Sequence, residues 1–355
     1  MSPVGTISNV AVLGFGTVGS ALARRLTSVH TPRGLRLTHI LDRRADAKRP
    51  LHPALGGIRW TTSIVDILES DADIVVEAIG GIDPAAVWIR GALAAGKSVV
   101  TANKQVVARE GLRLLTLAAR QGRQLRFEAA VGGAMPVVRA IGDGLAGDSL
   151  TRIDAILNGT TNAVLSTMEA AGCSLESALA DARARGFAEA DPAADLDGSD
   201  ARAKLAILCA LAFGVLVRPD QIEARSTAGV TAADVGAARS EGRAIRQVAH
   251  ADYDRVRSRL TAWVAPIAVD ADSMFAATVG PRNAAIVTGE HSGETTMTGT
   301  GAGGDATAVA IIADLVAIAR DRAAIVPPPR LATPRTIAGF SEAGAEPFDI
   351  LAEVV

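Results

Sequence analysis

The residues best suited to chemistry lie between Gly186 and Lys204. Within this run five carboxylates precede a single lysine: Glu189, Asp191, Asp195, Asp197 and Asp200. Lys204 stands one helical turn after Asp200 and directly before an apolar stretch, so we expect the pair at the head of a helix. A lysine held beside an aspartate can exchange a proton with a bound substrate. The run therefore indicates proton transfer, and the rest of the chain must supply a cofactor.

Two plainer interpretations of this acidic run compete with proton transfer. As a calcium loop framed on Gly198 it would need acids at its first and twelfth positions, but Ala193 and Lys204 stand there, so calcium is excluded. As a solvated helix start, Asp200 and Lys204 would form an exposed pair worth only about 0.2–0.5 kcal/mol. Against the second interpretation, carboxylates at this density repel one another unless they bind a cation. A substrate with an ammonium group would suit Glu189.

A glycine-rich run near the start of the chain indicates a bound nucleotide. Gly14-Phe15-Gly16-Thr17-Val18-Gly19 follows a predicted strand over residues 9–13 and opens a predicted helix. In that context the glycines permit a tight turn and close approach of a pyrophosphate, and the helix start offers amide donors to phosphate. Glycine-rich turns also occur for packing reasons alone. The position after the first strand favours a dinucleotide.

The end of the second predicted strand is where the ribose of such a cofactor would lie. Asp42 would accept hydrogen bonds from a ribose 2′-hydroxyl and favours NAD, whereas Arg43 and Arg44 would pair with the 2′-phosphate of NADP. The same residues would also suit a solvated charged loop. NAD and NADP both remain open.

Two further runs combine polar groups with strand ends or turns. Thr101-Ala102-Asn103-Lys104 closes a predicted strand, where a lysine is as often a surface residue at a helix start as a functional one. In the run 127–136, Glu128 precedes a glycine turn whose carbonyl oxygens could hold a monovalent cation. Sequence alone favours an ordinary linking loop for this second run.

The elements that must position these residues alternate between strand and helix over the first part of the chain. The predicted strands are 9–13, 35–41, 73–79, 98–101 and 124–127. The predicted helices between them are 18–28, 64–69, 84–95 and 105–120. Alternation of this kind implies right-handed crossovers and a parallel sheet covered on both faces. We expect an α/β, Rossmann-like, doubly wound domain over residues 1–148.

After Pro136, which is suited to open a helix, the pattern changes. A strand is predicted over 150–157, and helices over 160–171, 175–185 and 199–213. From 241 to 297 strands follow one another, with the clearest alternation in 255–263. These residues predict a second, α+β domain over 149–304 for substrate binding and dimerisation. A last helix over 305–320 and a proline-rich segment over 327–334 are expected to pack back, with the tail to 355, on the first domain.

Bulk properties exclude several classes of partner. A formal net charge of −2 and a pI near 6.2 give no field that would gather nucleic acid or anionic lipid. No window is apolar enough over the length of a membrane span, and residues 1–10 lack the cationic head and long apolar run expected of a secretory leader. The two cysteines form neither a disulfide framework nor a metal motif, and the five histidines are scattered. We expect a cytoplasmic enzyme with a small-molecule substrate, no nucleic acid and no membrane.

The motifs, in this order, resemble homoserine dehydrogenase over roughly residues 8–320. The resemblance rests on the runs 14–19, 101–104, 128–136, Asn158-Gly159-Thr160-Thr161-Asn162, 186–204 and 299–307. It implies NAD(P)-dependent interconversion of L-homoserine and L-aspartate 4-semialdehyde in threonine and methionine biosynthesis. It also implies a homodimer formed through the second domain.

The resemblance further implies a role for individual residues. It makes Lys204 the proton donor, Lys104 a second active-site lysine, and Asp200 and Glu189 substrate ligands, with Asp200 favouring the protonated amine of Lys204. The implied cofactor contacts are Phe15, Thr17, Val18, Thr101, Lys104, Gly186 and Gly303. The implied sodium ligands are Glu128, Val131, Gly133 and Met135.

Departures from the family pattern and rival interpretations limit this transfer. The residues after 320 are too few for the C-terminal ACT domain of many bacterial members, so we expect no feedback inhibition through one. Ala194 and Ser199 replace an aspartate and a leucine seen in relatives, and neither position has a chemical role. Aspartate semialdehyde dehydrogenase would need a nucleophilic cysteine in a suitable context, which this chain lacks. A Rossmann-type regulatory protein that binds nucleotide without catalysis is the remaining alternative.

Overall fold

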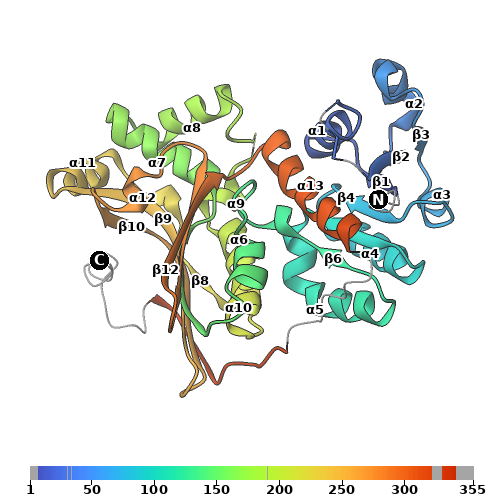
Figure 1. Ribbon diagram of the computed structural model, residues 1–355. Helices are drawn as coiled ribbons and strands as arrows, with labels where there is room; N and C mark the ends of the chain where they lie inside the picture. The colour runs from blue at the N-terminus through green and yellow to red at the C-terminus, as the bar shows by residue number, and fades with distance from the viewer. Residues whose placement is uncertain (1–6, 30, 33, 190, 322–329, 341–355) are drawn as a thin grey trace. The chain divides into compact units, whose positions relative to one another are not determined.

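The computed structural model describes residues 7–29, 31–32, 34–189, 191–321 and 330–340. Contacts between residues divide the chain into two compact units. The first comprises Met1–Ala134 and Gly303–Pro329, and the second comprises Met135–Ala302 and Arg330–Val355. Each unit has its own sheet (Figure 1) and its own buried core.

The first unit contains a parallel sheet with the strand order β3-β2-β1-β4-β5-β6. Its strands are β1 Ser8–Leu13, β2 Leu35–Leu41, β3 Arg59–Thr61, β4 Ile74–Glu77, β5 Ser98–Thr101 and β6 Leu125–Arg126. The order reverses between β1 and β4, which is the switch point where doubly wound sheets bind ligands at their carboxyl ends. The predicted Rossmann-like α/β class is confirmed, with β3 as a strand that the sequence pattern did not indicate.

Helices cover both faces of this sheet because the crossovers on the two sides of the switch point run in opposite directions. The helices of this unit are α1 Thr17–Leu26, α2 Ala45–Lys48, α3 Ile64–Leu68, α4 Ala85–Ala94, α5 Lys104–Arg120 and α13 Gly304–Arg320, with the 3₁₀ turns η1 Arg49–Leu51, η2 Pro53–Leu55 and η3 Glu128–Ala130. Figure 1 shows α1 beside α13, and the two share one apolar core with Val10 and Val12. Helices α4 and α5 contact each other away from that core. The late helix α13 thus completes a domain that the first part of the chain begins.

The second unit is built on a mixed sheet in the order β12-β11-β7-β9-β10-β13, with β8 beside β10. The strands are β7 Leu150–Ile156, β8 Glu223–Ala224, β9 Arg243–Asp254, β10 Arg259–Asp270, β11 Arg282–Gly289, β12 Gly293–Thr300 and β13 Thr336–Ala338. Neighbours are antiparallel except that β8 and β13 run parallel to β10. This confirms the expected second α+β domain.

The helices of the second unit are α6 Val137–Arg139, α7 Gly159–Ala171, α8 Leu175–Ala184, α9 Ala193–Leu196, α10 Ser199–Phe213, α11 Ala232–Ser240 and α12 Met274–Ala277, with one π-helical turn, η4 Ala140–Gly144, and the 3₁₀ turns η5 Pro219–Gln221 and η6 Thr227–Gly229. Ile245 of β9 packs with residues of α7, α8 and α11 on one face of this sheet, whereas its neighbour Ala244 packs with Phe275 of α12 on the other. Pro136 is the cap before α6, as expected. Figure 1 shows α7, α8 and α11 together on their side of the sheet.

Three expectations about boundaries need correction. The second unit begins at Met135 instead of residue 149, because α6 and η4 belong to it. The alternating run 255–263 is not one strand, since β9 ends at Asp254 and residue Ser258, with φ +51°, lies in the turn before β10. Residues 330–340 do not pack back on the first domain, because β13 pairs with β10. The other residues of the expected tail, 322–329 and 341–355, lie outside the described residues.

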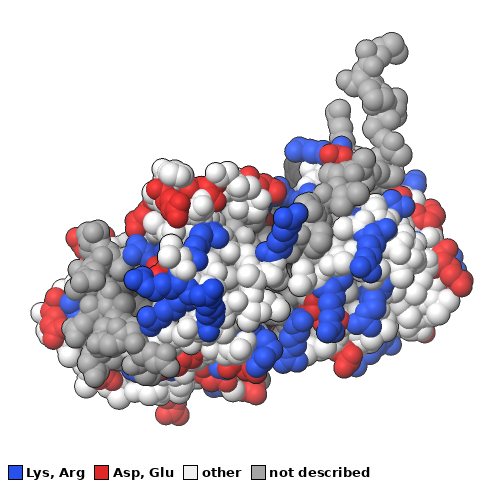
Figure 2. All heavy atoms as spheres, turned by 90° about the horizontal axis from the view of Figure 1, so that it is seen from below, with Lys and Arg blue, Asp and Glu red and all other residues white. Residues whose placement is uncertain are grey.

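Charge is distributed in separate groups over the molecular surface. On the face shown in Figure 2, Lys and Arg side chains form several groups with uncharged surface between them, and Asp and Glu lie mostly toward the edges of the view. Among the described residues no helix has the length and apolar character to cross a membrane. The absence of a nucleic-acid partner stays a prediction.

Candidate active site

The glycine run lies at the switch point of the first sheet, between β1 and α1. Gly14 has φ +93°, and a Cβ there would lie 2.8 Å from the carbonyl oxygen of Ala78. A Cβ on Gly19 would lie 1.9 Å from the carbonyl oxygen of Gly14, so α1 approaches the turn too closely for any side chain. A Cβ on Gly16 would meet no heavy atom within 4 Å. Two glycines therefore serve the fold, and the third leaves open space.

That open space lies at the amino end of α1, where Gly16 is the cap residue. No side chain caps this helix start in the described part of the chain. The first amides of α1, at Thr17 and Val18, therefore suit a phosphate, which the helix dipole also favours. Phe15 is buried against His52 and Trp60, with ring centroids 4.9 and 4.7 Å away. The loop offers its backbone to a ligand, while its aromatic side chain anchors it.

Asp42 binds back to the glycine loop. Its Oδ2 accepts hydrogen bonds from the Phe15 amide at 2.9 Å and from Lys48 Nζ at 2.6 Å, and its Oδ1 accepts one from the Arg44 amide at 2.9 Å. Lys48 Nζ also donates to the Phe15 carbonyl at 2.7 Å. Burial raises the pKa of Asp42, but the bonds from Lys48, Arg44 and Phe15 outweigh it, and the pKa lies below its usual value. Asp42 thus fixes the glycine loop from its place directly after β2.

The carboxyl edge of the sheet is organised by a buried glutamate at the end of β4. Glu77 Oε1 accepts hydrogen bonds from the amides of Ile79 and Gly80 at 2.8 and 3.1 Å, and its Oε2 accepts one from Thr101 Oγ1 at 2.5 Å. Thr101 Oγ1 in turn accepts the Asn103 amide at 3.0 Å. Glu77 therefore ties the ends of β4 and β5 together beneath the glycine loop.

Lys104 is the first residue of α5, directly after this network. Asn103 caps the helix, since its Oδ1 accepts the Val106 amide at 3.2 Å while its Nδ2 donates to the Gly81 carbonyl at 2.5 Å. Lys104 is half-buried. The capping bonds hold the backbone of Lys104 at the carboxyl edge of the sheet, on the side of the glycine loop.

The start of α13 meets the start of α1. A Cβ on Gly304 would lie 2.7 Å from the carbonyl oxygen of Thr17, so the two helix ends touch through their backbones. Gly303, the cap of α13, has φ +111° and open space where a side chain would stand. Gly303 and Thr17, both expected cofactor contacts, therefore lie close together within the first unit.

The Glu128 loop follows β6. Glu128 is 4% exposed, and its amide donates to Asp314 Oδ2 of α13 at 2.9 Å. Gly132 and Gly133 have φ +82° and +62°, so the backbone turns sharply after buried Val131. Met135, the fourth expected sodium ligand, is buried as the first residue of the second unit. A buried carboxylate in a glycine turn suits a cation, and no cluster of three or more His, Cys, Asp or Glu with metal-binding geometry occurs within the described ranges.

In the second unit, Lys204 and Asp200 form a nearly buried pair. Lys204 Nζ donates to Asp200 Oδ2 and to the Leu157 carbonyl, each at 2.6 Å. Their side chains are 12% and 8% exposed. The expectation of a helix head is confirmed, because α10 begins at Ser199, with Gly198 at φ +80° before it. An ammonium held in this way can donate a proton to a neighbouring oxygen.

Two more side chains complete this cluster. Asn158, the cap residue of α7, donates through Nδ2 to Asp195 Oδ1 at 2.6 Å and to Asp200 Oδ2 at 2.9 Å. Burial raises the pKa of Asp195, and the nearby Asp200 acts in the same direction. The hydrogen bond from Asn158 and the Lys204 ammonium oppose that rise.

The other acidic residues of the run lie outside this cluster. Asp191 Oδ1 accepts the Ala193 amide at 3.0 Å before α9, and Asp197 Oδ1 accepts the Ser199 amide at 2.7 Å before α10. These two aspartates therefore shape turns at helix starts. Gly186, with φ +75°, lies in the turn after α8. Glu189 is exposed and, within the described residues, is not bonded to Lys204 or Asp200.

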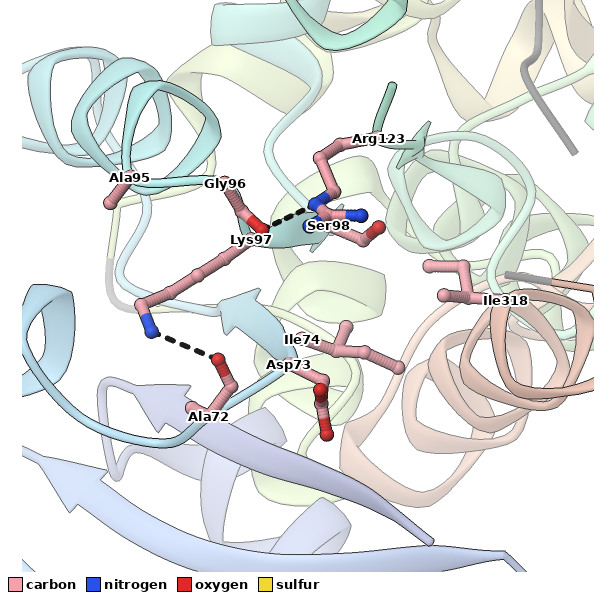
Figure 3. A pocket seen from close by; sticks show the side chains of 9 residues that line it. All are labelled: Ala72, Asp73, Ile74, Ala95, Gly96, Lys97, Ser98, Arg123 and Ile318. Carbon is pink, nitrogen blue, oxygen red and sulfur yellow. Dashed lines mark hydrogen bonds between the residues drawn. The ribbon is translucent and has the colours of Figure 1, made fainter. Parts of the chain in front are cut away.

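A separate pocket of about 170 Å³ lies at the opposite, amino edge of the first sheet (Figure 3). Its lining includes Asp73, Lys97 and Arg123, and Lys97 Nζ donates to the Ala72 and Ser70 carbonyls at 2.9 and 2.7 Å. The lysine is thus bonded to backbone. The pocket is remote from the carboxyl edge where parallel sheets bind ligands.

Sequence reasoning missed Glu77 and Lys48 and left Asp195 without a role. Glu77 ends an apolar strand just before Gly80 and Gly81, and a charged residue at that edge is a usable signal. Lys48 lies in a charged stretch, where nothing in the sequence distinguishes it. Asp195 becomes informative only through its hydrogen bond to Asn158.

A doubly wound sheet with a glycine loop at its switch point, together with a unit that holds a lysine–aspartate pair, defines a dinucleotide-dependent oxidoreductase. Family models agree: "Homoserine dehydrogenase, NAD binding domain" matches residues 14–128, and "Homoserine dehydrogenase" matches residues 136–316. The chain belongs to the homoserine dehydrogenase family, and it is an NAD(P)-dependent oxidoreductase.

Individual relatives support this assignment. Homoserine dehydrogenase of Mycobacterium tuberculosis is 41% identical over 326 residues, which cover 90% of this chain and 73% of the relative. The crystal structure of a homoserine dehydrogenase from Thiobacillus denitrificans matches with a TM-score of 0.86 and 32% identity, covering 94% of this chain and 80% of that one. A hyperthermophilic archaeal homoserine dehydrogenase in complex with NADPH matches with a TM-score of 0.74 and 26% identity, covering 92% and 100%.

Proposed function

We propose that the chain interconverts L-homoserine and L-aspartate 4-semialdehyde, with Lys204 exchanging a proton with the substrate oxygen. The main support is the Lys204–Asp200 pair, with 2.6 Å between Nζ and Oδ2 in a nearly buried position. When bound, the nicotinamide supplies or accepts the hydride at the adjacent carbon. As the aldehyde is reduced, negative charge develops on its oxygen, and the Lys204 ammonium stabilises that charge and donates the proton. The hydrogen bond to Asp200 holds the ammonium in place for this transfer.

Lys104 is the proposed second active-site lysine. The cap of α5 by Asn103 fixes its backbone, and a lysine at this edge can orient the substrate or share in charge stabilisation. Lys104→Ala should therefore raise KM for homoserine more than it lowers kcat. Lys204→Ala should lower kcat more than it raises KM, which separates the two roles.

Glu189 and Asp200 are the proposed substrate ligands. The exposed Glu189 carboxylate can pair with the substrate ammonium. Asp200 acts at the reacting end of the substrate, because it is bonded to Lys204. Glu189→Gln keeps the size and one acceptor oxygen but removes the charge. We expect a higher KM for homoserine with little change in kcat.

The residues at the first unit fit a dinucleotide, since Gly16 leaves open space at an uncapped helix start. We propose that Thr101, Lys104, Gly186 and Gly303 also contact the cofactor. The NADPH complex of the archaeal relative favours NADP as one accepted form, and Arg43 and Arg44 are available to a 2′-phosphate. Asp42 would serve a free 2′-hydroxyl in NAD.

A sodium ion on Glu128, Val131, Gly133 and Met135 is a further part of the proposal. It would bind the Glu128 carboxylate and brace the loop, without a direct part in the reaction. Replacing sodium by choline in the assay buffer should lower activity and thermal stability together. A Glu128→Gln variant should lose most of that sensitivity.

We also propose a homodimer formed through the second unit, as the family resemblance implies. Light scattering on the purified protein tests this directly. A mass near twice the 36.3 kDa of the chain supports it, and a monomer at working concentration contradicts it.

The reaction itself is tested by following nicotinamide absorbance with homoserine and either NAD or NADP over a range of pH. L-2-aminobutyrate, which has the ammonium and carboxylate but no hydroxyl, is the matched blank. Oxidation of homoserine but not of the blank supports the proposal, and the ratio of the two kcat/KM values gives the cofactor preference. No absorbance change with either cofactor at any pH would contradict it.

A further inference from the structure

Asn158 lies where β7 ends and α7 begins, and its side chain uses both of its polar ends. It is 4% exposed. Its Oδ1 accepts the Thr161 amide at 2.8 Å and Thr161 Oγ1 at 2.9 Å, which caps α7. Since the Thr161 amide can only donate, the atom facing it must be oxygen, and the amide nitrogen must face the other way.

The amide nitrogen faces two carboxylates from different helices. Its two hydrogens match its two acceptors, Asp195 Oδ1 of α9 and Asp200 Oδ2 of α10, at 2.6 and 2.9 Å. Two carboxylates so close to one donor would repel each other without it. The Asn158 amide therefore bridges the two carboxylates, beside the Lys204 ammonium that is bonded to Asp200.

The same stretch of chain also fixes the ammonium. Lys204 Nζ donates to Asp200 Oδ2 and to the carbonyl of Leu157, the residue before Asn158. The Leu157 carbonyl further accepts Asn283 Nδ2 at 3.3 Å. The two residues that follow β7 thus set the position of Lys204 by two routes, one through the Leu157 carbonyl and one through the Asn158 amide and Asp200.

We propose that Asn158 is a positioning residue for the dehydrogenase reaction, whose amide fixes Asp200, and through it Lys204, while holding Asp195 beside them. This inference rests on the roles proposed above for Lys204 and Asp200. Asn158 acts through these groups and exchanges no proton itself. Its Oδ1 also caps α7, so the same side chain links this helix to Asp195 and Asp200.

The charge balance around Asp195 supports this role. The charged groups that act on Asp195 are Asp200 and Lys204, both from α10. Burial and the charge of Asp200 raise the pKa of Asp195. The hydrogen bond from Asn158 lowers it, and the Lys204 ammonium and a hydrogen bond from Thr160 lower it further. Without the amide donor, Asp195 would take up a proton at higher pH, and its link to Asp200 would be lost.

Two substitutions separate positioning from helix capping. Asn158→Ser keeps an oxygen suited to cap α7 but removes the amide donors. Asn158→Asp keeps the shape and the cap, and it places a third carboxyl against Asp195 and Asp200. Both variants should fold, which circular dichroism and thermal unfolding can check.

We expect Asn158→Ser to lower kcat for homoserine about 10- to 100-fold, as small misplacements of catalytic groups do, with the cofactor Kd unchanged. For Asn158→Asp, the ratio of its kcat/KM to that of the wild type should fall as pH rises. The cause is that the new carboxyl can donate a hydrogen bond only while protonated. A helix cap alone would not produce that dependence.

Asn162→Ser is the matched control, since Asn162 lies in the same helix and its amide donates to the Thr278 and Gly280 carbonyls, each at 2.9 Å. This control should lose thermal stability with a pH-independent activity ratio. Wild-type kcat in Asn158→Ser, or a flat pH ratio in Asn158→Asp, would overturn the inference. If the wild type oxidises homoserine and Lys204→Ala does not, such a result rejects only the positioning role of Asn158. An inactive wild type rejects the proposed function instead.

Discussion

Lys204 donates to Asp200 across one turn of α10, with 2.6 Å between Nζ and Oδ2, and both side chains are nearly withdrawn from solvent. An exposed pair at this spacing would contribute little. Here the ammonium also bonds to the Leu157 carbonyl, so its position is fixed from two directions. The ammonium is therefore held at one fixed place, as the proposed proton donor requires.

Replacing Lys204 should separate chemistry from binding. We expect Lys204→Ala to lower kcat by about 10²- to 10⁴-fold, the range of general acid–base catalysis, with the cofactor Kd unchanged. Lys204→Arg keeps the charge beside Asp200 but cannot release a proton, so it should stay nearly inactive. Initial rates and titration of protein fluorescence with NADPH check both points. Equal losses of turnover and cofactor binding would count against the role.

The glycine loop allows a matched comparison. Gly16→Ala adds a methyl group into open space, so stability should be unchanged while KM for the cofactor rises. In Gly19→Ala the methyl group would stand 1.9 Å from the Gly14 carbonyl oxygen, and such overpacking typically costs about 1–3 kcal/mol of stability. Urea unfolding and cofactor KM values distinguish the two. A Gly16→Ala variant with wild-type cofactor KM would place the phosphates elsewhere.

Asp42 connects cofactor binding to acid stability. Burial alone would raise the pKa of Asp42, but the hydrogen bonds, chiefly the one from Lys48, lower it in the folded protein. The carboxylate therefore binds a proton more weakly in the folded state than in the unfolded state. Its contribution is present above the unfolded value of 3.8 and is lost as pH falls through the folded value. Asp42→Asn should therefore raise cofactor KM and reduce stability by about 1 kcal/mol at neutral pH, with the deficit shrinking in acid. A deficit that does not change with pH would show that the charge is unimportant.

The sequence predicted those features that local patterns determine. Alternating strands and helices gave the parallel sheet, and the spacing of Asp200 and Lys204 gave their pairing. Strands β3 and β13 were not predicted, because a strand of three residues shows no recognisable period in the sequence. Each is defined by its hydrogen bonds to the neighbouring strand of the sheet. Glu77 and Asn158 act through hydrogen bonds to residues 24 and 42 positions away, Thr101 and Asp200. Such partners can be identified only once the strands and helices are placed together in the fold.

The Asp148 carboxylate should stabilise the folded protein at every pH except in strong acid. Its carboxylate accepts amide bonds from Ser149 and Ser292, each at 2.7 Å, and from His291, so it holds the turn between β11 and β12. The Ser292 side chain and these amides lower its pKa to about 2 from 3.8. Because the folded pKa is the lower one, the stabilisation is complete above about pH 4 and disappears as pH falls through about 2.

The Asp148→Asn variant tests that reasoning. Near neutral pH it should unfold at a lower temperature than the wild type, and the difference should narrow between pH 4 and pH 2, where the wild-type carboxylate takes up its proton. Asp272→Asn, at an exposed position before α12, is the control and should leave the unfolding temperature unchanged at every pH. Thermal unfolding followed by circular dichroism across this range measures both. A constant difference between wild type and Asp148→Asn would mean that the turn depends on shape and not on the charge of Asp148.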